Sequence, residues 1–369
     1  MNNTYEIKKI EYLEKEDFIL VVIQVSDLSR AKCYLNEKEY DELLNKCEPY
    51  DFKTHIFLFP KDELSRLKKF NLVLTSHLKG NNAPIRELVI DYDEALIVPN
   101  ELTFTRPNRG IKVVETINKT LSTGAMYILE KCETSKGWPV LYHILKISLK
   151  NCDIVVSTTK LMENNLTKGQ TVLEQAELMQ ENHSVIAATN ADFFDIEDTG
   201  LPSGLCIKEG KIIANPNFNR PFFGITKQGL PIISTPDKVD LKNIKEAVGG
   251  MQFLVRDASV ADIAPIQPFG ERPHPRTAVG ITKDNDIIIM IVDGREKEYS
   301  TGASLVELSE AMIRHGAQIA LNLDGGGSST LIINENQKLV MVNRPAKLIT
   351  QEKNEPRPVY NALIVKLKQ

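Results

Sequence analysis

The sequence predicts an α+β protein, built mainly on a mixed, largely antiparallel sheet with helices packed against it. Apolar runs of strand length outnumber the segments that have helical periodicity. Two pairs of these runs are joined by short polar turns, which is the pattern of a hairpin. The run at residues 287–292 is apolar throughout, so we expect it to be covered on both faces.

The first hundred residues predict a small α+β domain. Residues 18–25 indicate a buried strand, and residues 37–46 have helical spacing with their apolar residues on one face. Residues 99–110 (PNELTFTRPNRG) concentrate turn formers, so we place the domain boundary there. We therefore expect an N-terminal domain at residues 1–105, whose role no motif indicates. Further strands are expected at residues 56–59, 70–75 and 88–98, and a further helix at residues 61–69.

Residues 111–369 predict the second and larger domain. Its clearest helix is expected at residues 304–316, because Ser304 and Glu307 form a capping box and Gly316 stands at the C-terminal stop. A second helix is expected at residues 171–181. Hairpins or strands are expected at residues 142–149, 154–158, 185–189, 205–214, 277–292, 318–323, 331–333 and 359–365.

The composition is that of a globular protein and gives no basic surplus. Apolar residues make up 42% and charged residues 25% of the 369 residues. Lys and Arg number 45 against 49 Asp and Glu, which gives a net charge of 45 − 49 = −4. We therefore expect no general nucleic-acid binding, although a local anion pocket remains compatible with this balance.

The cysteines and the N-terminus indicate where the protein works. The five cysteines are scattered and form no C-x-x-C pair, so we expect free thiols in a reducing compartment. The N-terminal segment lacks the features of a secretion signal. No apolar run approaches the roughly 18 residues of a membrane span. The expected location is cytoplasmic or virion-associated, without membrane insertion.

Polar clusters follow several predicted strands, where loops carry functional groups on a rigid scaffold. Residues 190–195 (NADFFD) fit either a site for a hydroxyl-rich ligand or a cation, or a simple turn. Residues 271–277 present Arg276 after two prolines, which suits a bidentate phosphate contact but also an ordinary surface arginine. Residues 293–295 (DGR) close the all-apolar strand, although Asp-Gly is also a common turn.

The most informative cluster is residues 322–330 (NLDGGGSST). Its three glycines allow the backbone to approach a ligand and direct successive N–H groups at an anion. Neither a lysine after the glycines nor a G-x-G-x-x-G spacing is present, which excludes the usual nucleotide-binding loops. Ser203 lacks the first glycine of G-x-S-x-G, and the six histidines form no H-x-x-x-H. Serine and zinc hydrolases are therefore disfavoured.

These motifs resemble those of the phosphodiester glycosidase family. The order and intervals agree over roughly residues 142–367, with NLDGGGSST the most specific part and PRTAVG and VDGR next. Two departures stand out: Ala191 and Asp192 occupy positions where the family commonly has glycines, and the first hundred residues have no recognised counterpart in the animal member. The matching segments are residues 190–195, 274–280, 293–295, 302–307, 322–330 and 357–363.

The resemblance implies hydrolysis of a sugar-1-phosphodiester at the anomeric C–O bond, which leaves a free sugar and a phosphomonoester. Phosphate is a weakly basic leaving group, so such a site needs cations and N–H donors for the phosphate and a carboxylate for the anomeric carbon. We expect Asp324 to be the base or nucleophile, with Asp293 or Asp192 as the second acid. The phosphate would be held by Arg276, Arg295 and the loop Gly325, Gly326, Gly327, Ser328 and Ser329, and sugar hydroxyls by Asn190 and Asn322.

Other roles and functions stay open at this point. Arg357 either reaches the pocket or braces the last strand, and its capping box already accounts for Glu307. No cofactor is required, while a divalent cation near Asp192 or Asp324 would fit. The expected partner is a small-molecule or glycan phosphodiester, and the oligomeric state is open. The substrate class could also be nucleotide sugars or modified nucleotides.

A non-catalytic alternative is a carbohydrate or glycopolymer binding module of a phage or cell-surface assembly, with the N-terminal domain for attachment. The acidic residues favour an enzyme, because a binder of an anionic ligand has no need of several carboxylates.

Overall fold

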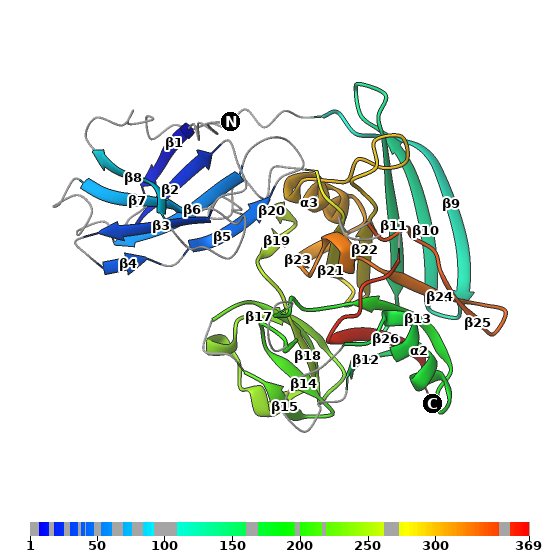
Figure 1. The fold of residues 1–369 in the computed structure, drawn as a ribbon. Helices are drawn as coiled ribbons and strands as arrows, with labels where there is room; N and C mark the ends of the chain where they lie inside the picture. Colours follow the sequence, from blue (N-terminus) through cyan, green and yellow to red (C-terminus); the bar gives the residue numbers. More distant parts are fainter. Residues whose placement is uncertain are drawn as a thin grey trace. The chain divides into compact units, whose positions relative to one another are not determined.

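The computed structural model divides the chain into two compact units, Met1–Arg106 and Pro107–Gln369. It describes residues 109–368 apart from 160–168, 196–199, 216–218, 262–272 and 347–354, together with the courses of eight strands in the first unit. Figure 1 shows the strands and helices of both units.

The described strands of the first unit form two four-stranded antiparallel sheets, in the orders β1-β2-β6-β5 and β4-β3-β7-β8. Strands β2, β6 and β7 coincide with predicted strands. The helix predicted at residues 37–46 is wrong, because β4 and β5 occupy this segment and β5 pairs with β6. A short apolar run fits either periodicity, and tertiary pairing decides between them. The helix predicted at residues 61–69 lies outside the described residues, apart from Lys69, which begins β7.

The strands of the first unit have the bounds β1 Ile7–Glu14, β2 Phe18–Val25, β3 Arg30–Leu35, β4 Lys38–Tyr40, β5 Glu42–Cys47, β6 Lys53–Pro60, β7 Lys69–Thr75 and β8 Pro84–Asp91.

The second unit contains three antiparallel sheets (Figure 1). The eight-stranded sheet has the order β20-β19-β23-β21-β22-β11-β10-β9, and the two five-stranded sheets have the orders β12-β26-β13-β24-β25 and β15-β14-β18-β16-β17. The bounds in the largest sheet are β9 Lys112–Ser122, β10 Ala125–Glu133, β11 Pro139–Ile147, β19 Phe253–Arg256, β20 Ser259–Val260, β21 Arg276–Thr282, β22 Ile287–Val292 and β23 Ala317–Asn322. Those in the smaller sheets are β12 Cys152–Thr158, β13 Val185–Asn190, β24 Leu331–Glu335, β25 Lys338–Met341 and β26 Asn361–Leu367, then β14 Cys206–Lys208, β15 Lys211–Ala214, β16 Phe222–Thr226, β17 Pro231–Ser234 and β18 Ile244–Gly249.

Two α-helices, α2 (Val172–Gln180) and α3 (Leu305–Arg314), are described in this unit. The α+β class is therefore correct only in part, since the described chain is mostly antiparallel sheet. The capping box of α3 is confirmed: Glu307 N donates to Ser304 Oγ at 3.2 Å, and Ser304 N donates to Glu307 Oε2 at 2.8 Å. No helix among the described residues is long and apolar enough to cross a bilayer.

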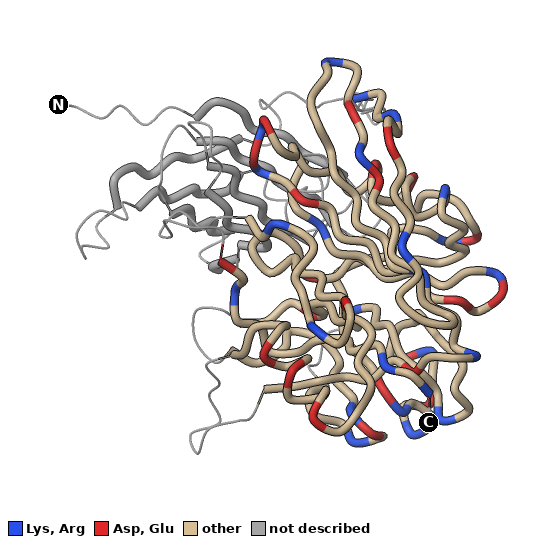
Figure 2. Tube along the Cα trace, turned by 90° about the vertical axis from the view of Figure 1, so that its right-hand side faces the viewer, with Lys and Arg blue, Asp and Glu red and all other residues tan. Residues whose placement is uncertain are grey.

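The core lies on both faces of the eight-stranded sheet. One face packs with the β12–β25 sheet, where Ile289 and Leu321 meet Leu363 of β26 in one buried cluster. The other face is covered by α3 through Leu308 and Met312. Strand β22 is buried at all its positions, which confirms the prediction from its unbroken apolar run. Charges of both signs gather at strand ends and loops of this unit (Figure 2).

Candidate active site

Asn190 joins the elements around the candidate site. It is the last residue of β13 and is fully buried. Its Oδ1 accepts hydrogen bonds from Thr277 Oγ1 and Thr330 N, both at 3.1 Å, and its Nδ2 donates to the carbonyl of Asp324 at 2.6 Å. The side chain thus ties β13 to β21 and to the glycine loop. This arrangement favours a positioning role over the predicted contact with sugar hydroxyls.

Two predicted carboxylates, Asp192 and Asp324, are brought together by this arrangement. Asp324 N donates to the carbonyl of Ala191 at 3.0 Å, so the glycine loop begins beside the end of β13. The side chain of Asp192 is fully buried, and its Oδ2 accepts from Gly204 N at 2.7 Å. Burial raises the pKa of Asp192 to about 7, with a smaller upward contribution from the charge of Asp324 and opposing ones from Arg220 and backbone N–H groups.

The Asp192 carboxylate lies between two glycines, Gly204 just before β14 and Gly249 at the end of β18. A Cβ on Gly204 would lie 2.7 Å from Asp192 Oδ2, and one on Gly249 would lie 2.6 Å from the same oxygen. No side chain fits at either position. Arg220 completes this enclosure: its Nη2 lies 3.8 Å from Asp192 Oδ1, and its Nε donates to the carbonyl of Gly250 at 3.0 Å.

Three arginines, Arg276, Arg295 and Arg357, lie close to one another near the glycine loop. Arg276 is fully buried, its Nε donates to the carbonyl of Ala303 at 3.0 Å, and burial and the charge of Arg295 lower its pKa to about 9. Desolvation by the surrounding protein and the positive charge of Arg357 lower the pKa of Arg295, and the negative charge of Asp324 raises it. Arg295 remains exposed, so an incoming anion can reach it. Like charges held this close together favour an anion between them.

The glycine loop lies against these arginines. A Cβ on Gly326, which has φ +64°, would lie 3.2 Å from Nη2 of Arg295, and Arg357 Nη1 donates to Ser328 Oγ at 3.3 Å. Gly326 N donates to the carbonyl of Pro275 at 2.9 Å. Within the described chain the amides of Gly325 and Gly327 make no hydrogen bond, so both remain available to an anion.

The remaining residues of the 322–330 cluster take different positions. Asn322 is buried at the end of β23, and its Oδ1 has no hydrogen-bond partner among the described residues. Ser329 is buried, and its Oγ forms a hydrogen bond with Thr277 Oγ1 at 3.2 Å, which ties this part of the cluster to β21.

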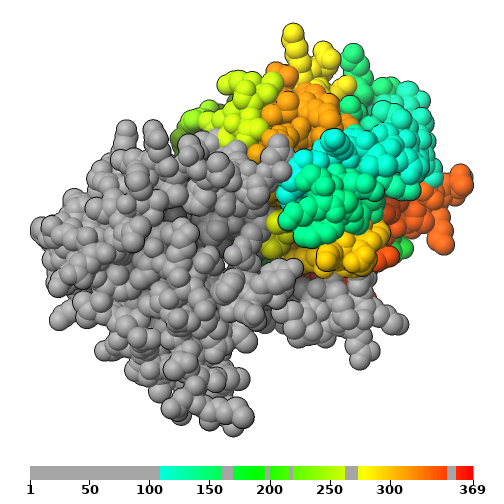
Figure 3. Space-filling model, turned by 90° about the horizontal axis from the view of Figure 1, so that it is seen from above, coloured from blue at the N-terminus to red at the C-terminus, as the bar shows by residue number. Residues whose placement is uncertain are grey.

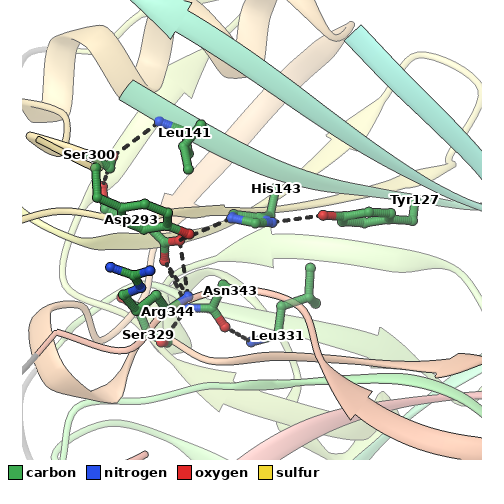
Figure 4. A network of polar contacts seen from close by, with 10 residues as sticks. Tyr127, Leu141, His143, Asp293, Ser300, Ser329, Leu331, Asn343 and Arg344 are labelled. Atoms are coloured by element: carbon green, nitrogen blue, oxygen red, sulfur yellow. Dashed lines mark hydrogen bonds and ion pairs between the residues drawn. The ribbon is translucent and has the colours of Figure 1, made fainter. Parts of the chain in front are cut away.

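Asp293 is the centre of a buried network of polar contacts (Figure 4). Its Oδ2 contacts His143 Nε2 at 3.1 Å and accepts from Tyr299 OH at 2.9 Å. Its Oδ1 accepts from Asn343 Nδ2 at 3.0 Å, and both oxygens accept from Arg344 N. A carboxylate that is fully occupied in this way favours a structural role over that of a second acid.

This network also holds the residues that directly follow the glycine loop. Asn343 Nδ2 donates to the carbonyl of Ser329 at 3.0 Å, and its Oδ1 accepts from Leu331 N at 2.7 Å (Figure 4). On the other side, Tyr127 OH contacts His143 Nδ1 at 2.8 Å. The chain of contacts therefore links β10 and β11 to the loop that follows the three glycines.

We expect Asp293→Ala to lower the free energy of unfolding by about 3 kcal/mol or more, because it leaves several buried donors unpaired. Urea unfolding followed by circular dichroism measures the change. The matched variant is Glu296→Ala, which removes an exposed pair with Arg344 and should cost less than about 1 kcal/mol. Equal stability of the two variants would show that Asp293 does not hold the structure together.

Glu307 is occupied outside the site. Besides capping α3, it forms a bidentate pair with Arg109, whose Nε and Nη2 donate to Oε1 and Oε2, both at 2.7 Å. Among the residues that the structure describes, no three His, Cys, Asp or Glu side chains are grouped as metal ligands. Asp192 and Asp324 are the carboxylates that could contact a cation at this site.

Comparison with known proteins supports the family that the motifs resemble. Residues 183–366 match the family model for phosphodiester glycosidase. The N-acetylglucosamine-1-phosphodiester alpha-N-acetylglucosaminidase of Bos taurus is 27% identical over 165 residues, which are 40% of this chain and 31% of the bovine protein. The Homo sapiens protein of the same name is 23% identical, and the matched stretch covers 32% of its length. The chain thus spans less than a third of these relatives.

Two solved structures share the fold. The catalytic domain of the zebrafish N-acetylglucosamine-1-phosphodiester alpha-N-acetylglucosaminidase superposes with a TM-score of 0.55 at 21% identity, covering 70% of this chain and 89% of that chain. A hypothetical protein from Synechocystis superposes with a TM-score of 0.51 at 11% identity, covering 100% of this chain and 81% of that chain. The mostly antiparallel fold of this chain is therefore shared with the zebrafish catalytic domain. The chain belongs to the phosphodiester glycosidase family through residues 183–366.

Proposed function

We propose that this chain hydrolyses a sugar-1-phosphodiester at the anomeric C–O bond and releases a free sugar and a phosphomonoester. The observation that carries the proposal is that the charge of Asp324 acts both on Arg295 at the glycine loop and on the buried carboxylate of Asp192 with its neighbour Arg220. Arg276 and Arg357 lie close enough to Arg295 to interact with its charge.

The arginine side suits the phosphate. A phosphodiester carries one negative charge and its leaving phosphomonoester carries more, so the guanidinium groups stabilise the charge that develops as the bond breaks. The amides of Gly325 and Gly327, which donate to no described residue, are further N–H donors for the anion. Because phosphate leaves readily, strong general-acid assistance at this end is unnecessary.

The carboxylate side suits the sugar. Asp324 is the base or nucleophile of the proposal: it activates a water molecule or attacks the anomeric carbon as positive charge develops there. Asp192 has a pKa of about 7, so near neutral pH both of its protonation states are populated and it can give or take a proton. Asn322 Oδ1 is an acceptor for a sugar hydroxyl.

The test is release of free sugar from a panel of substrates, which comprises N-acetylglucosamine-1-phosphodiesters, a nucleotide sugar such as UDP-N-acetylglucosamine, and a sugar-1-phosphate. We expect turnover of a phosphodiester, with the free sugar and the phosphomonoester formed in equal amounts. The panel also separates simple sugar phosphodiesters from nucleotide sugars. If the protein binds these compounds but hydrolyses none of them, the proposal is contradicted and the protein is a carbohydrate-binding module instead.

A further inference from the structure

The edge of the eight-stranded sheet is an unusually open strand. β9 is the outermost strand and is hydrogen-bonded to β10 on one side, and it lies at the rim of the sheet (Figure 1). All of its residues from Lys112 to Thr120 are exposed, including Val113 (42%), Val114 (63%) and Ile117 (41%). Its side chains, coloured cyan, lie on the surface of the second unit (Figure 3). A long edge with exposed apolar residues is a template for pairing with another strand.

The sequence of β9 is complementary to itself in one antiparallel register. The strand Lys112–Ser122 is centred on Ile117. When two copies run antiparallel with Ile117 opposite Ile117, Glu115 faces Lys119 of the second copy, and the reciprocal pair repeats this contact. Thr116 then faces Asn118. The apolar residue at the axis thus meets its own copy, and opposite charges meet.

Neighbouring registers lack this match. Facing residues must lie on the same face of the sheet, so an alternative axis can pass through any one residue of the strand. An axis at Glu115 or at Lys119 places like charges opposite each other. An axis at Thr116 places Glu115 opposite Ile117, and an axis at Asn118 places Ile117 opposite Lys119.

Two bulges limit the central stretch of β9, residues 115–120, at its two ends. In its pairing with β10 the register shifts at Val114 and again at Leu121, and the residues between them pair regularly. Bulges bend an edge strand and interrupt pairing, so they limit the contact to the central stretch. They also pin its register.

The charges of this stretch already have partners that extend the pattern. Glu115 forms an ion pair with Lys131 at 2.9 Å, and Lys119 forms one with Glu335 at 2.6 Å. With Ile117 opposite Ile117, Lys131 and Glu115 of one copy lie in a row with Lys119 and Glu335 of the second copy. The charges along this row alternate in sign. We propose that two copies of this chain associate through β9, with a two-fold axis at Ile117, so that their eight-stranded sheets join into one continuous sheet.

Sedimentation velocity of the full chain at increasing micromolar concentration tests the proposal. We expect a species of twice the 41.5 kDa chain mass, in reversible exchange with the monomer. Ile117→Lys places two like charges on the axis and should raise the dissociation constant at least about tenfold. The matched control is Ile212→Lys, the same change at an exposed position of β15, the edge strand of another sheet. It should leave association unchanged.

A charge exchange tests the register. Glu115→Lys and Lys119→Glu should each weaken association, because each places like charges opposite each other twice in the dimer. The double variant restores opposite charges and should recover dimerisation. Circular dichroism melting of every variant confirms that the monomer remains folded. A monomer at all concentrations, or a dimer equally insensitive to Ile117→Lys and to the charge changes, would overturn the proposal.

Discussion

Asp324→Asn lowers kcat/KM for a sugar-1-phosphodiester by at least about 100-fold if the carboxylate acts at the anomeric carbon. The substitution keeps the size of the side chain but removes the charge and the basic oxygen. Two backbone contacts of residue 324, the N–H to Ala191 and the carbonyl to Asn190, are kept in this variant. Circular dichroism melting checks that the variant remains folded. Initial rates of sugar release measure the effect.

Asp286→Asn is the matched control for this variant. Asp286 lies in the turn between β21 and β22, away from the glycine loop, and the substitution should leave kcat/KM within about twofold of the unsubstituted protein. Both variants should bind the substrate with similar affinity by calorimetry. Turnover by Asp324→Asn at the rate of the control would remove Asp324 from the chemistry.

Arg295→Gln should lower kcat/KM for phosphodiester substrates by about 100-fold, because it removes one charged donor from the developing phosphate. The effect depends on the charge of the leaving group. We therefore expect the same variant to hydrolyse a neutral aryl glycoside of the same sugar as well as the unsubstituted protein does. Comparing kcat/KM of both proteins on both substrates gives the ratio directly.

Arg344→Gln serves as the control arginine. Its side chain is about half exposed and pairs with Glu296, outside the arginine cluster. It should change neither activity by more than about twofold. An equal loss on charged and neutral substrates in Arg295→Gln would show that Arg295 supports the structure of the site and does not hold the phosphate.

Several features could be predicted because local sequence determines them. The unbroken apolar run of β22 required cover on both faces, and the S-x-x-E pattern located the start of α3. The residues after β13 and β23 came together because both follow strands that end at the same place, and Asn190 bonds directly to Asp324.

Other features depend on which strands become neighbours. Gly204, Gly249 and Arg220 enclose Asp192, yet they come from separate segments at or next to strands β14, β18 and β16 and carry no motif. Asp293 follows a strand as Asp192 does, but its carboxylate lies against His143 and Asn343, which no local pattern indicates. Periodicity alone also assigned residues 37–46 to a helix, where pairing with β6 produces a strand.

The most direct test of the central claim is hydrolysis of a sugar-1-phosphodiester in water enriched in ¹⁸O, with the phosphomonoester product analysed by mass spectrometry. Cleavage of the anomeric C–O bond adds the oxygen of water to the sugar, whether Asp324 attacks the carbon or activates water. The account therefore predicts a phosphomonoester without ¹⁸O. Incorporation of ¹⁸O into the phosphomonoester would show that water attacks phosphorus, and it would make this protein a phosphodiesterase of the P–O type.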